Sequence, residues 1–168
     1  LKSVTSAAGN TYGFTITIVG KVETVTLPNG GVLSYGYDED NNLTSYIDAC
    51  GSTIRYEYDE QHRMTAWYSG TEQRVIDNAY DEEGRVTKQT DGNGYDALFT
   101  YSDGQTVTTD GNGNPTTYMY DERYRTKSIA YADGTKETFT YADNRLASQS
   151  DALGHTTGYT YDEQGNIT

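Results

Sequence analysis

Aromatic and aliphatic residues recur along the chain about every 20 residues, and polar residues alternate with them inside each period. A slot that usually holds tyrosine marks each copy, at Ile16, Tyr37, Tyr58, Tyr80, Tyr101, Tyr120, Tyr141 and Tyr161. A second aromatic residue usually precedes this slot by two positions, as Tyr56 precedes Tyr58. Because residues two apart share one face of a strand, the pattern predicts a β-strand that ends at each slot. No segment keeps the i, i+3, i+4, i+7 spacing of an amphipathic helix, so we expect an all-β fold.

Turn residues of two types separate the predicted strands. The first type follows the slot as Tyr-Asp-x-x-Gly, with the aspartates Asp38, Asp59, Asp81, Asp121 and Asp162 and the glycines Gly84 and Gly165. The second places a glycine seven residues before the slot, at Gly9, Gly30, Gly51, Gly94, Gly113, Gly134 and Gly154. Aspartate at the first turn position can accept hydrogen bonds from backbone N–H groups two residues on, and glycine can take the left-handed position that ends the turn.

Each copy therefore contains two predicted strands and two tight turns. A period near 20 residues is typical of repeat architectures. Consecutive strands joined by tight turns pair antiparallel, so the chain predicts a continuous meander of roughly 15 strands. We interpret residues 1–168 as a single array of about eight repeats.

Some positions depart from this pattern. His62 and Tyr124 stand where glycine or asparagine suits the left-handed position, so we expect distorted turns there. Gly70 precedes the slot at Tyr80 by ten residues instead of seven, which predicts about three extra residues within 71–79. The pair at 67–68, directly before this segment, does not match the repeat columns.

The composition is acidic and poor in apolar residues. The formal net charge is −13, and hydrophobic residues make up 34% of the chain, with 17 tyrosines among them. The negative charge disfavours binding to nucleic acid or to anionic membranes. The core must be thin and rich in tyrosine, whose hydroxyl groups need partners when buried. No apolar run reaches the ~18 residues of a membrane-spanning helix, and residues 1–20 do not resemble a signal peptide.

No group of residues predicts catalysis or the binding of a metal or cofactor. Cys50 is the only cysteine, which excludes an internal disulfide and a cysteine zinc site. Residues 38–42 and 110–114 place oxygen ligands at alternate positions, as calcium loops do, but neither has glutamate at position twelve, and turn formation explains both. His62 and His155 lie in separate turns without a nucleophile motif, and the carboxylates occupy matching turn positions instead of forming an acid/base pair.

The segment Tyr-Asp-Glu-Glu-Gly-Arg-Val-Thr at 80–87, followed by Asp-Gly-Asn-Gly at 91–94, resembles the YD repeat, also called the RHS repeat. Residues 159–168 are another close match, and the resemblance covers essentially the whole chain. Similar arrays occur in bacterial Rhs proteins, insecticidal toxin complexes, wall-associated proteins and animal teneurins. The resemblance implies a spiralling sheet that forms a hollow shell, and in the toxins this shell encloses a toxic domain. The core segment that those toxins use for self-cleavage is not present, so self-cleavage is not carried over to any residue.

The resemblance implies a structural role in a large secreted or cell-surface protein, of bacterial origin, whose β-shell encloses or displays another domain. The implied partners are other repeats of the parent chain, an enclosed toxin domain and glycans. The alternative function is a carbohydrate-binding adhesin module, for which Trp67 and Tyr68 are the candidate ligand-binding residues because exposed aromatic rings can stack on sugars. The remaining assigned residues are the structural signature of the repeat: Tyr37, Asp38, Gly51, Tyr58, Asp59, Tyr80, Asp81, Gly84, Gly94, Tyr101, Gly113, Tyr120, Asp121, Gly134, Tyr141, Gly154, Tyr161, Asp162 and Gly165.

Both ends of the chain fall in the same phase of the repeat. Leu1 and Ile167 occupy the aliphatic column that follows each slot by about six residues. The terminal repeats of complete arrays usually differ from the others and act as caps. We therefore expect a fragment of a longer array, whose end strands present unpaired edges and self-associate.

Overall fold

The computed structural model describes residues 2–168, which form two units. The first unit runs to Gly94, and the second runs from Tyr95 to Thr168. Residues 2–168 contain no helix, and therefore none long and apolar enough to span a bilayer. The all-β prediction is confirmed, whereas the assignment of Leu1 to the aliphatic column lies outside the described residues.

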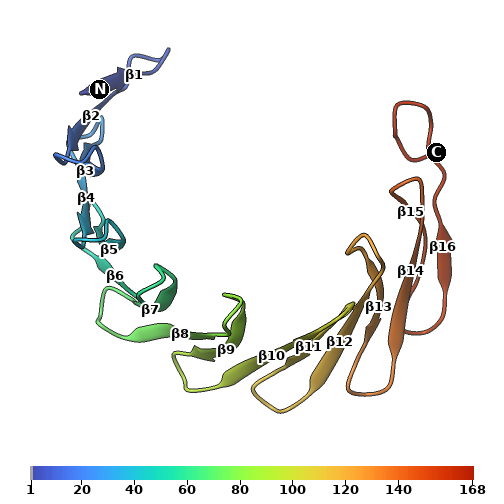
Figure 1. Cartoon of the computed structure of the whole chain (residues 1–168). Helices are drawn as coiled ribbons and strands as arrows, with labels where there is room; N and C mark the ends of the chain where they lie inside the picture. The colour runs from blue at the N-terminus through green and yellow to red at the C-terminus, as the bar shows by residue number, and fades with distance from the viewer. Residues whose placement is uncertain (1) are drawn as a thin grey trace. The chain divides into compact units, whose positions relative to one another are not determined.

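The first unit is an antiparallel meander in which each strand pairs with the next along the chain (Figure 1). Its described strands are β1 (Ser3–Thr5), β2 (Thr11–Ile16), β3 (Val22–Thr26), β4 (Val32–Tyr37), β5 (Leu43–Ile47), β6 (Thr53–Tyr58), β7 (Met64–Tyr68), β8 (Arg74–Tyr80) and β9 (Val86–Asp91). The predicted alternation of strands and tight turns is confirmed in this unit.

The second unit repeats the same arrangement. Its strands are β10 (Asp96–Ser102), β11 (Gln105–Thr109), β12 (Pro115–Tyr120), β13 (Thr126–Ala130), β14 (Lys136–Ala142), β15 (Arg145–Ser150) and β16 (Thr156–Gly158). Two of its hairpins have two-residue turns, because Ser102 pairs with Gln105 and Ala142 pairs with Arg145.

A β-bulge accompanies the tyrosine slot in most copies. In the third copy Glu57 pairs with Ala66, but the next residue, Tyr58, pairs with Met64, so Thr65 is the extra residue. The same register shift occurs before Ile16, Tyr37, Tyr80, Tyr120 and Tyr141. In these copies the bulge increases the local twist and places the residue five or six positions after the slot directly opposite the slot tyrosine or isoleucine.

In each unit, the sheet face that carries the slots is called here the tyrosine face. In the first unit its middle row is apolar across neighbouring strands: Tyr35 pairs with Tyr46, and the centres of these two rings are 5.4 Å apart. Tyr46 in turn pairs with Ile54 of β6. On the same face, Tyr56 of β6 pairs with Trp67, and Trp67 also pairs with Ile76. Cross-strand contacts between aromatic and β-branched side chains therefore stabilise this face.

The core is as thin as the composition predicts. Among the described residues, Ala66 is the one buried hydrophobic residue, and no large side chain is fully buried. Asn78 and Ser128 are buried polar residues. Asn78 occupies the position two residues before Tyr80, where other copies have an aromatic ring, and its amide donates a hydrogen bond to the Met64 carbonyl oxygen at 3.1 Å. Hydrogen bonding and half-buried aromatic rings thus replace the layered core of an ordinary domain.

The predicted distortion at His62 and Tyr124 is wrong. Both residues take the left-handed conformation, with φ values of 62° and 58°. Their N–H groups donate to the carbonyl oxygens of Asp59 and Asp121 at 3.0 and 2.9 Å, as the glycine N–H groups do in the other turns. The hydrogen bonds that close the turn therefore fix the backbone, and they hold His62 and Tyr124 in a left-handed conformation that these residue types disfavour.

The prediction of three extra residues within 71–79 is also wrong. Glu72, not Gly70, ends the turn, with a φ of 58° and an N–H that donates to Ser69 O at 2.9 Å. Trp67 then pairs with Ile76 and Tyr68 with Arg74. One inserted residue, Val75, is therefore absorbed as a bulge.

Replacing Tyr124 with glycine is expected to stabilise the protein. The left-handed conformation costs most L-residues about 1–2 kcal/mol, part of which the larger backbone entropy of unfolded glycine offsets. Tyr124 is 86% exposed, so little packing is lost. A net gain of about 0.5–1 kcal/mol raises the melting temperature by about 2–4 °C, measured by circular dichroism. Gly113→Ala, at the left-handed position of the other turn type and with no atom near an added Cβ, should have the opposite effect. Equal melting temperatures for all three proteins would contradict this account.

Candidate functional site

The turn that follows each Tyr-Asp pair is organised by its aspartate. In the third copy, Oδ1 of Asp59 accepts hydrogen bonds from the backbone N–H groups of Gln61 and Arg63, both at 3.0 Å. In the sixth copy, Asp121 accepts equivalent bonds from Arg123 and Arg125 at 2.9 and 3.1 Å. The aspartate thus satisfies backbone donors that a two-stranded ladder leaves unpaired at its end.

The residue four positions after the aspartate binds the second carboxylate oxygen. The donors are Arg63, Arg85 and Arg125 through Nε, and Asn42 and Asn166 through Nδ2, all at 2.8–2.9 Å. This position is not among the columns predicted from the repeat pattern. The signal was present in the spacing Asp59–Arg63, which recurs at Asp81–Arg85 and Asp121–Arg125.

The arginine also reaches the next copy. The guanidinium carbon of Arg63 lies 4.6 Å from the ring centre of Tyr80, and its Nη1 donates to the Asp81 carbonyl oxygen at 3.0 Å. Cations over aromatic rings are attracted by the negative face of the ring. One side chain therefore holds the turn of its own copy and the slot tyrosine of the following copy.

The same arrangement recurs in the second unit. Arg125 lies 4.3 Å from the ring centre of Tyr141. Arg145 lies 5.3 Å from the ring centre of Tyr161, and its Nη1 donates to the carbonyl oxygen of Asp162 at 3.3 Å. We call each such arginine, with its aspartate where it has one and the next slot tyrosine, a repeat joint.

The slot tyrosines complete the joint with their hydroxyl groups. Four of these hydroxyls donate to a backbone carbonyl oxygen in the column that follows the slot of the preceding copy: Tyr37 to Val22 at 2.9 Å, Tyr80 to Met64 at 2.6 Å, Tyr141 to Thr126 at 2.8 Å and Tyr161 to Leu146 at 2.9 Å. The acceptor is backbone, so threonine at 126 serves as well as the aliphatic residues of the other copies. These four half-buried tyrosines therefore have the polar partners that their burial requires.

The repeat signature and the fold both match known proteins. The family model described as RHS Repeat matches residues 19–53, 37–73 and 141–168. A solved structure of a Photorhabdus luminescens Tc holotoxin pore superposes on 95% of the chain with a TM-score of 0.78 at 17% identity. A crystal structure of TcdB2-TccC3 superposes on 94% of the chain with a TM-score of 0.77 at 18% identity. The chain belongs to the RHS-repeat family.

The matches cover nearly all of this chain but only a small part of the solved chains. The chain spans 11% of the length of each of these two solved chains, and the identities below 20% relate the folds alone. No curated protein sequence gives a significant match. An RHS-repeat array is a structural element, and the repeat joints explain how its successive copies hold together.

Trp67 and Tyr68, the candidate ligand-binding pair, lie on opposite faces of this RHS array. Trp67 is half-buried on the tyrosine face between Tyr56 and Ile76. It follows its slot by nine residues, as Val25 and Tyr46 follow theirs, so the statement that it lies outside the repeat columns is wrong. The two rings therefore do not form one stacking platform.

Tyr68 lies in a charged cluster on the other face. The guanidinium carbon of Arg55 is 4.0 Å from its ring centre, and its hydroxyl donates to Glu57 at 3.2 Å. Arg55 also pairs with Glu57 at 2.7 Å. The hydrogen bond from Arg55 is the main cause that lowers the pKa of Glu57. These groups satisfy one another, so the cluster acts first as a clamp between β6 and β7.

The carboxylates that resembled calcium ligands also act within their turns. Asp110 accepts from the backbone N–H groups of Asn112 and Asn114 and from the Asn114 side chain at 2.8–3.0 Å. Within residues 2–168, no three His, Cys, Asp or Glu side chains are placed to hold a metal ion. Cys50 is exposed, and its N–H donates to Asp48 at 2.8 Å.

Acid is expected to weaken the RHS turns. Hydrogen bonds lower the pKa of the aspartate at the first turn position, and the bond from the Arg125 side chain is the main cause that lowers the pKa of Asp121 from 3.8 to about 2. Asn114 and Asn166 act in the same direction on Asp110 and Asp162. Because these carboxyls bind protons more weakly when folded, their stabilisation is complete above about pH 4 and is lost as the pH falls through the folded pKa values.

Thermal melts followed by circular dichroism between neutral pH and pH about 2 test this expectation. Asp121→Asn keeps an acceptor oxygen for the backbone donors but loses the charge, so it should lower the melting temperature at neutral pH and reduce its fall in acid. Glu122→Gln, at an exposed position of the same turn, is the matched control. A fall in acid equal to that of the parent protein would contradict a stabilising role of ionised Asp121.

Proposed function

We propose that this chain is a wall segment of a β-shell in a large secreted or cell-surface bacterial protein, and that the shell encloses or displays another domain. The observation that supports this most strongly is a sheet without a covering layer. The accessible surface of the described residues is 11274 Å², whereas a compact monomer of 18.6 kDa exposes about 8200 Å².

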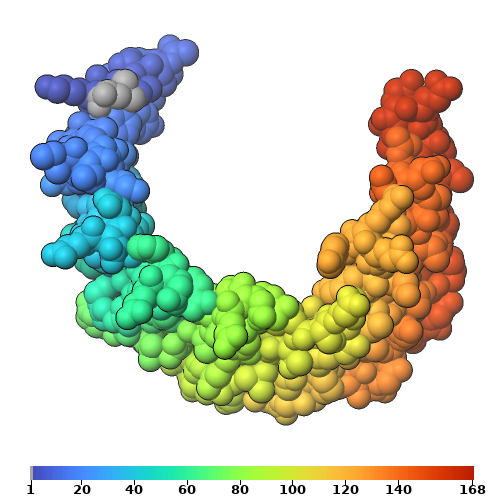
Figure 2. Space-filling view, viewed as in Figure 1, coloured from blue at the N-terminus to red at the C-terminus, as the bar shows by residue number. Residues whose placement is uncertain are grey.

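The open faces support a wall more than a self-contained domain. Figure 2 shows the first unit, coloured blue to green, as a narrow band with no second layer over its visible side. Repeat joints link successive copies through Arg63, Arg125 and Arg145, so the array can be extended without adding a core. In the first unit the tyrosine face carries half-buried rings, among them Tyr35, Tyr46 and Trp67, which suits a surface that faces other polypeptide.

Protease protection in the parent protein tests the proposal. The domain that follows the array in the parent chain is expected to resist proteolysis in the intact protein and to be cleaved rapidly when expressed alone. Equal cleavage rates in the two settings would contradict enclosure. Resistance of the array itself, followed on the same gel, shows that the wall is folded during the assay.

The carbohydrate-binding alternative is tested with a glycan array. Binding that is reproducible and is abolished by Trp67→Ala would favour an adhesin module. Tyr46→Ala removes the ring at the matching position of the preceding copy and is the control for general loss of packing. The separation of Trp67 and Tyr68 onto opposite faces favours the wall.

A further inference from the structure

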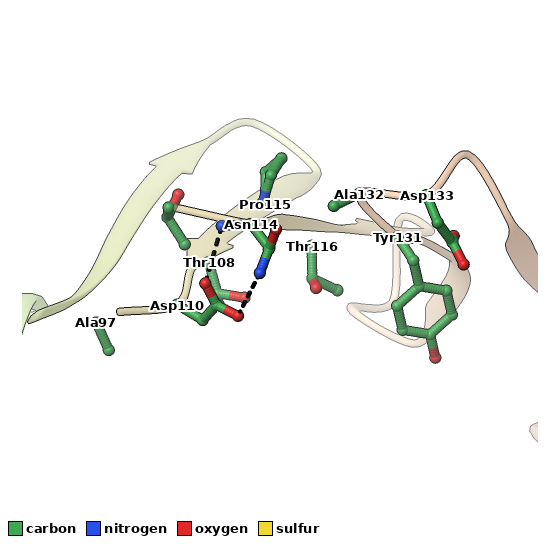
Figure 3. A pocket seen from close by; sticks show the side chains of 10 residues that line it. Ala97, Thr108, Asp110, Asn114, Pro115, Thr116, Tyr131, Ala132 and Asp133 are labelled. Atoms are coloured by element: carbon green, nitrogen blue, oxygen red, sulfur yellow. Dashed lines mark hydrogen bonds between the residues drawn. The ribbon is translucent and has the colours of Figure 1, made fainter. Parts of the chain in front are cut away.

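A groove of about 610 Å³ lies on the tyrosine face of the second unit, across β10–β13. Figure 3 shows the side chains of Ala97, Thr116 and Tyr131 projecting to the same side of their strands. Thr108 pairs with Thr116 across β11 and β12, and Asp133 stands at the rim beside Tyr131. A groove of this volume can hold a short stretch of polypeptide.

Small side chains create the groove. The residue four positions before the slot is Leu33, Ile54 or Ile76 in copies of the first unit. There it lies opposite another large apolar residue, as Leu33 pairs with Val25, Ile54 with Tyr46 and Ile76 with Trp67. The corresponding residues of the second unit are Ala97, Thr116, Glu137 and Thr157, and the first two of these line the groove. Their methyl groups leave an apolar floor that a ligand can cover.

The rim of the groove is acidic. None of the ten residues that line it is lysine or arginine, whereas Asp110 and Asp133 are both among them. The Tyr131 hydroxyl donates to the Glu137 carboxylate at 2.9 Å, which adds a third acidic group beside the ring. Hydrogen bonds within the turns lower the pKa of Asp110 and of Asp133, so both are ionised at neutral pH. The groove is therefore complementary to a cation with an apolar stem.

The chain itself shows how such a cation is held. Tyr68 donates to Glu57 as Tyr131 donates to Glu137, and Arg55 lies over the Tyr68 ring while paired with Glu57. Within residues 2–168, no guanidinium is found over the Tyr131 ring. The pair of Tyr131 and Glu137 thus has the chemistry of an arginine site without an arginine of this chain.

We propose that the groove binds an arginine side chain of an extended polypeptide segment. Its methylene stem covers the floor at Ala97 and Thr116, and its guanidinium lies over Tyr131 toward the carboxylates. Arginine suits this site better than lysine because its planar group stacks on the ring and donates several hydrogen bonds to carboxylates at once. The proposal does not depend on a shell, since it concerns one groove of the isolated chain.

Nuclear magnetic resonance titration of the full chain with acetyl-Gly-Arg-Gly-amide tests the proposal. The Ala97 and Thr116 methyl resonances should shift, with a dissociation constant on the order of 1 mM. The matched peptide with citrulline, which keeps the shape without the charge, should bind at least about tenfold more weakly. Thr116→Ile restores the filled row and should weaken binding about tenfold. Thr117→Ile, on the opposite face of the same strand, should leave binding unchanged.

Several outcomes would overturn the proposal. These are no methyl shift up to about 10 mM peptide, equal binding of the citrulline peptide, or an equal loss in Thr116→Ile and Thr117→Ile. Equal binding of acetyl-Gly-Lys-Gly-amide would overturn the assignment to arginine. Both isoleucine variants keep a β-branched residue in a strand, so folding is retained. Tyr131→Leu removes the ring on which the guanidinium stacks and should also weaken binding of the arginine peptide.

Discussion

Replacing Tyr80 by alanine is expected to lower the free energy of unfolding by about 2 kcal/mol. Removal of a fully buried aromatic ring costs about 3–5 kcal/mol, and Tyr80 is half-buried. The guanidinium carbon of Arg63 lies 4.6 Å from the centre of the Tyr80 ring, and the Tyr80 hydroxyl donates to the Met64 carbonyl oxygen at 2.6 Å. Both contacts join Tyr80 to the preceding copy. The stabilising energy lost in the variant is therefore energy that connects two successive repeats.

The conservative variant separates these contributions. Tyr80→Phe keeps the ring under Arg63 and loses one hydrogen bond, which should cost about 1 kcal/mol. Urea denaturation followed by circular dichroism measures both variants. Tyr12→Phe, at an exposed position of β2, should be close to neutral. If Tyr80→Phe were as costly as Tyr80→Ala, the ring would contribute nothing and the joint as described would be wrong.

The sequence predicted the strands and turns well because both depend on local chemistry. Alternation of apolar residues at 54, 56 and 58 sets one face of β6, and the Asp-x-x-Gly segments close the turns through their own backbone. The period then orders the strands of each unit without any long-range information, since within a unit each described strand contacts its neighbours along the chain. A repeat array is therefore easier to predict than a fold with distant pairings.

The errors arose where one turn could be built from different residues. Gly70 looked like the turn glycine, but the register of β7 and β8 places Glu72 in the left-handed position. His62 and Tyr124 looked unsuitable, but the turn hydrogen bonds hold them in the regular geometry. Residue preference is a weak guide where several backbone hydrogen bonds already determine the conformation.

The joint could be predicted in part. The Asp-to-Arg spacing of four residues was visible in the sequence, and the capacity of aspartate to accept bonds in turns was recognised. The contact from Arg63 to Tyr80 was not visible, because it depends on the bulge that sets the spacing of successive slots. The opposite faces of Trp67 and Tyr68 follow from strand alternation, but which face is aromatic depends on the register.

Replacing Arg125 by methionine is expected to destabilise the second unit by about 1–2 kcal/mol. Methionine keeps much of the apolar stem but loses the cation over Tyr141 at 4.3 Å and the paired bonds to Asp121. Arg125→Lys should be less destabilising than Arg125→Met but still less stable than the parent protein, because lysine lacks the planar group that stacks on the ring. Urea denaturation gives the energies.

A double-mutant cycle with Tyr141→Leu isolates the contact between copies. We expect a coupling energy of about 0.5–1 kcal/mol, the range of exposed cation–ring pairs. Lys127→Met, on the same strand, combined with Tyr141→Leu is the matched control and should be additive. Additivity of Arg125→Met with Tyr141→Leu would mean that the arginine acts within its own turn alone.

The position of the loss is as informative as its size. In an array, each copy is stabilised by itself and by its neighbours, so a weakened joint should open locally. Hydrogen exchange in Arg125→Met should therefore rise in β12–β14, whereas β2–β5 of the other unit should exchange as before. A uniform rise over both units would mean that the array unfolds as one body, and the joints would then set global stability instead of the connection between two copies.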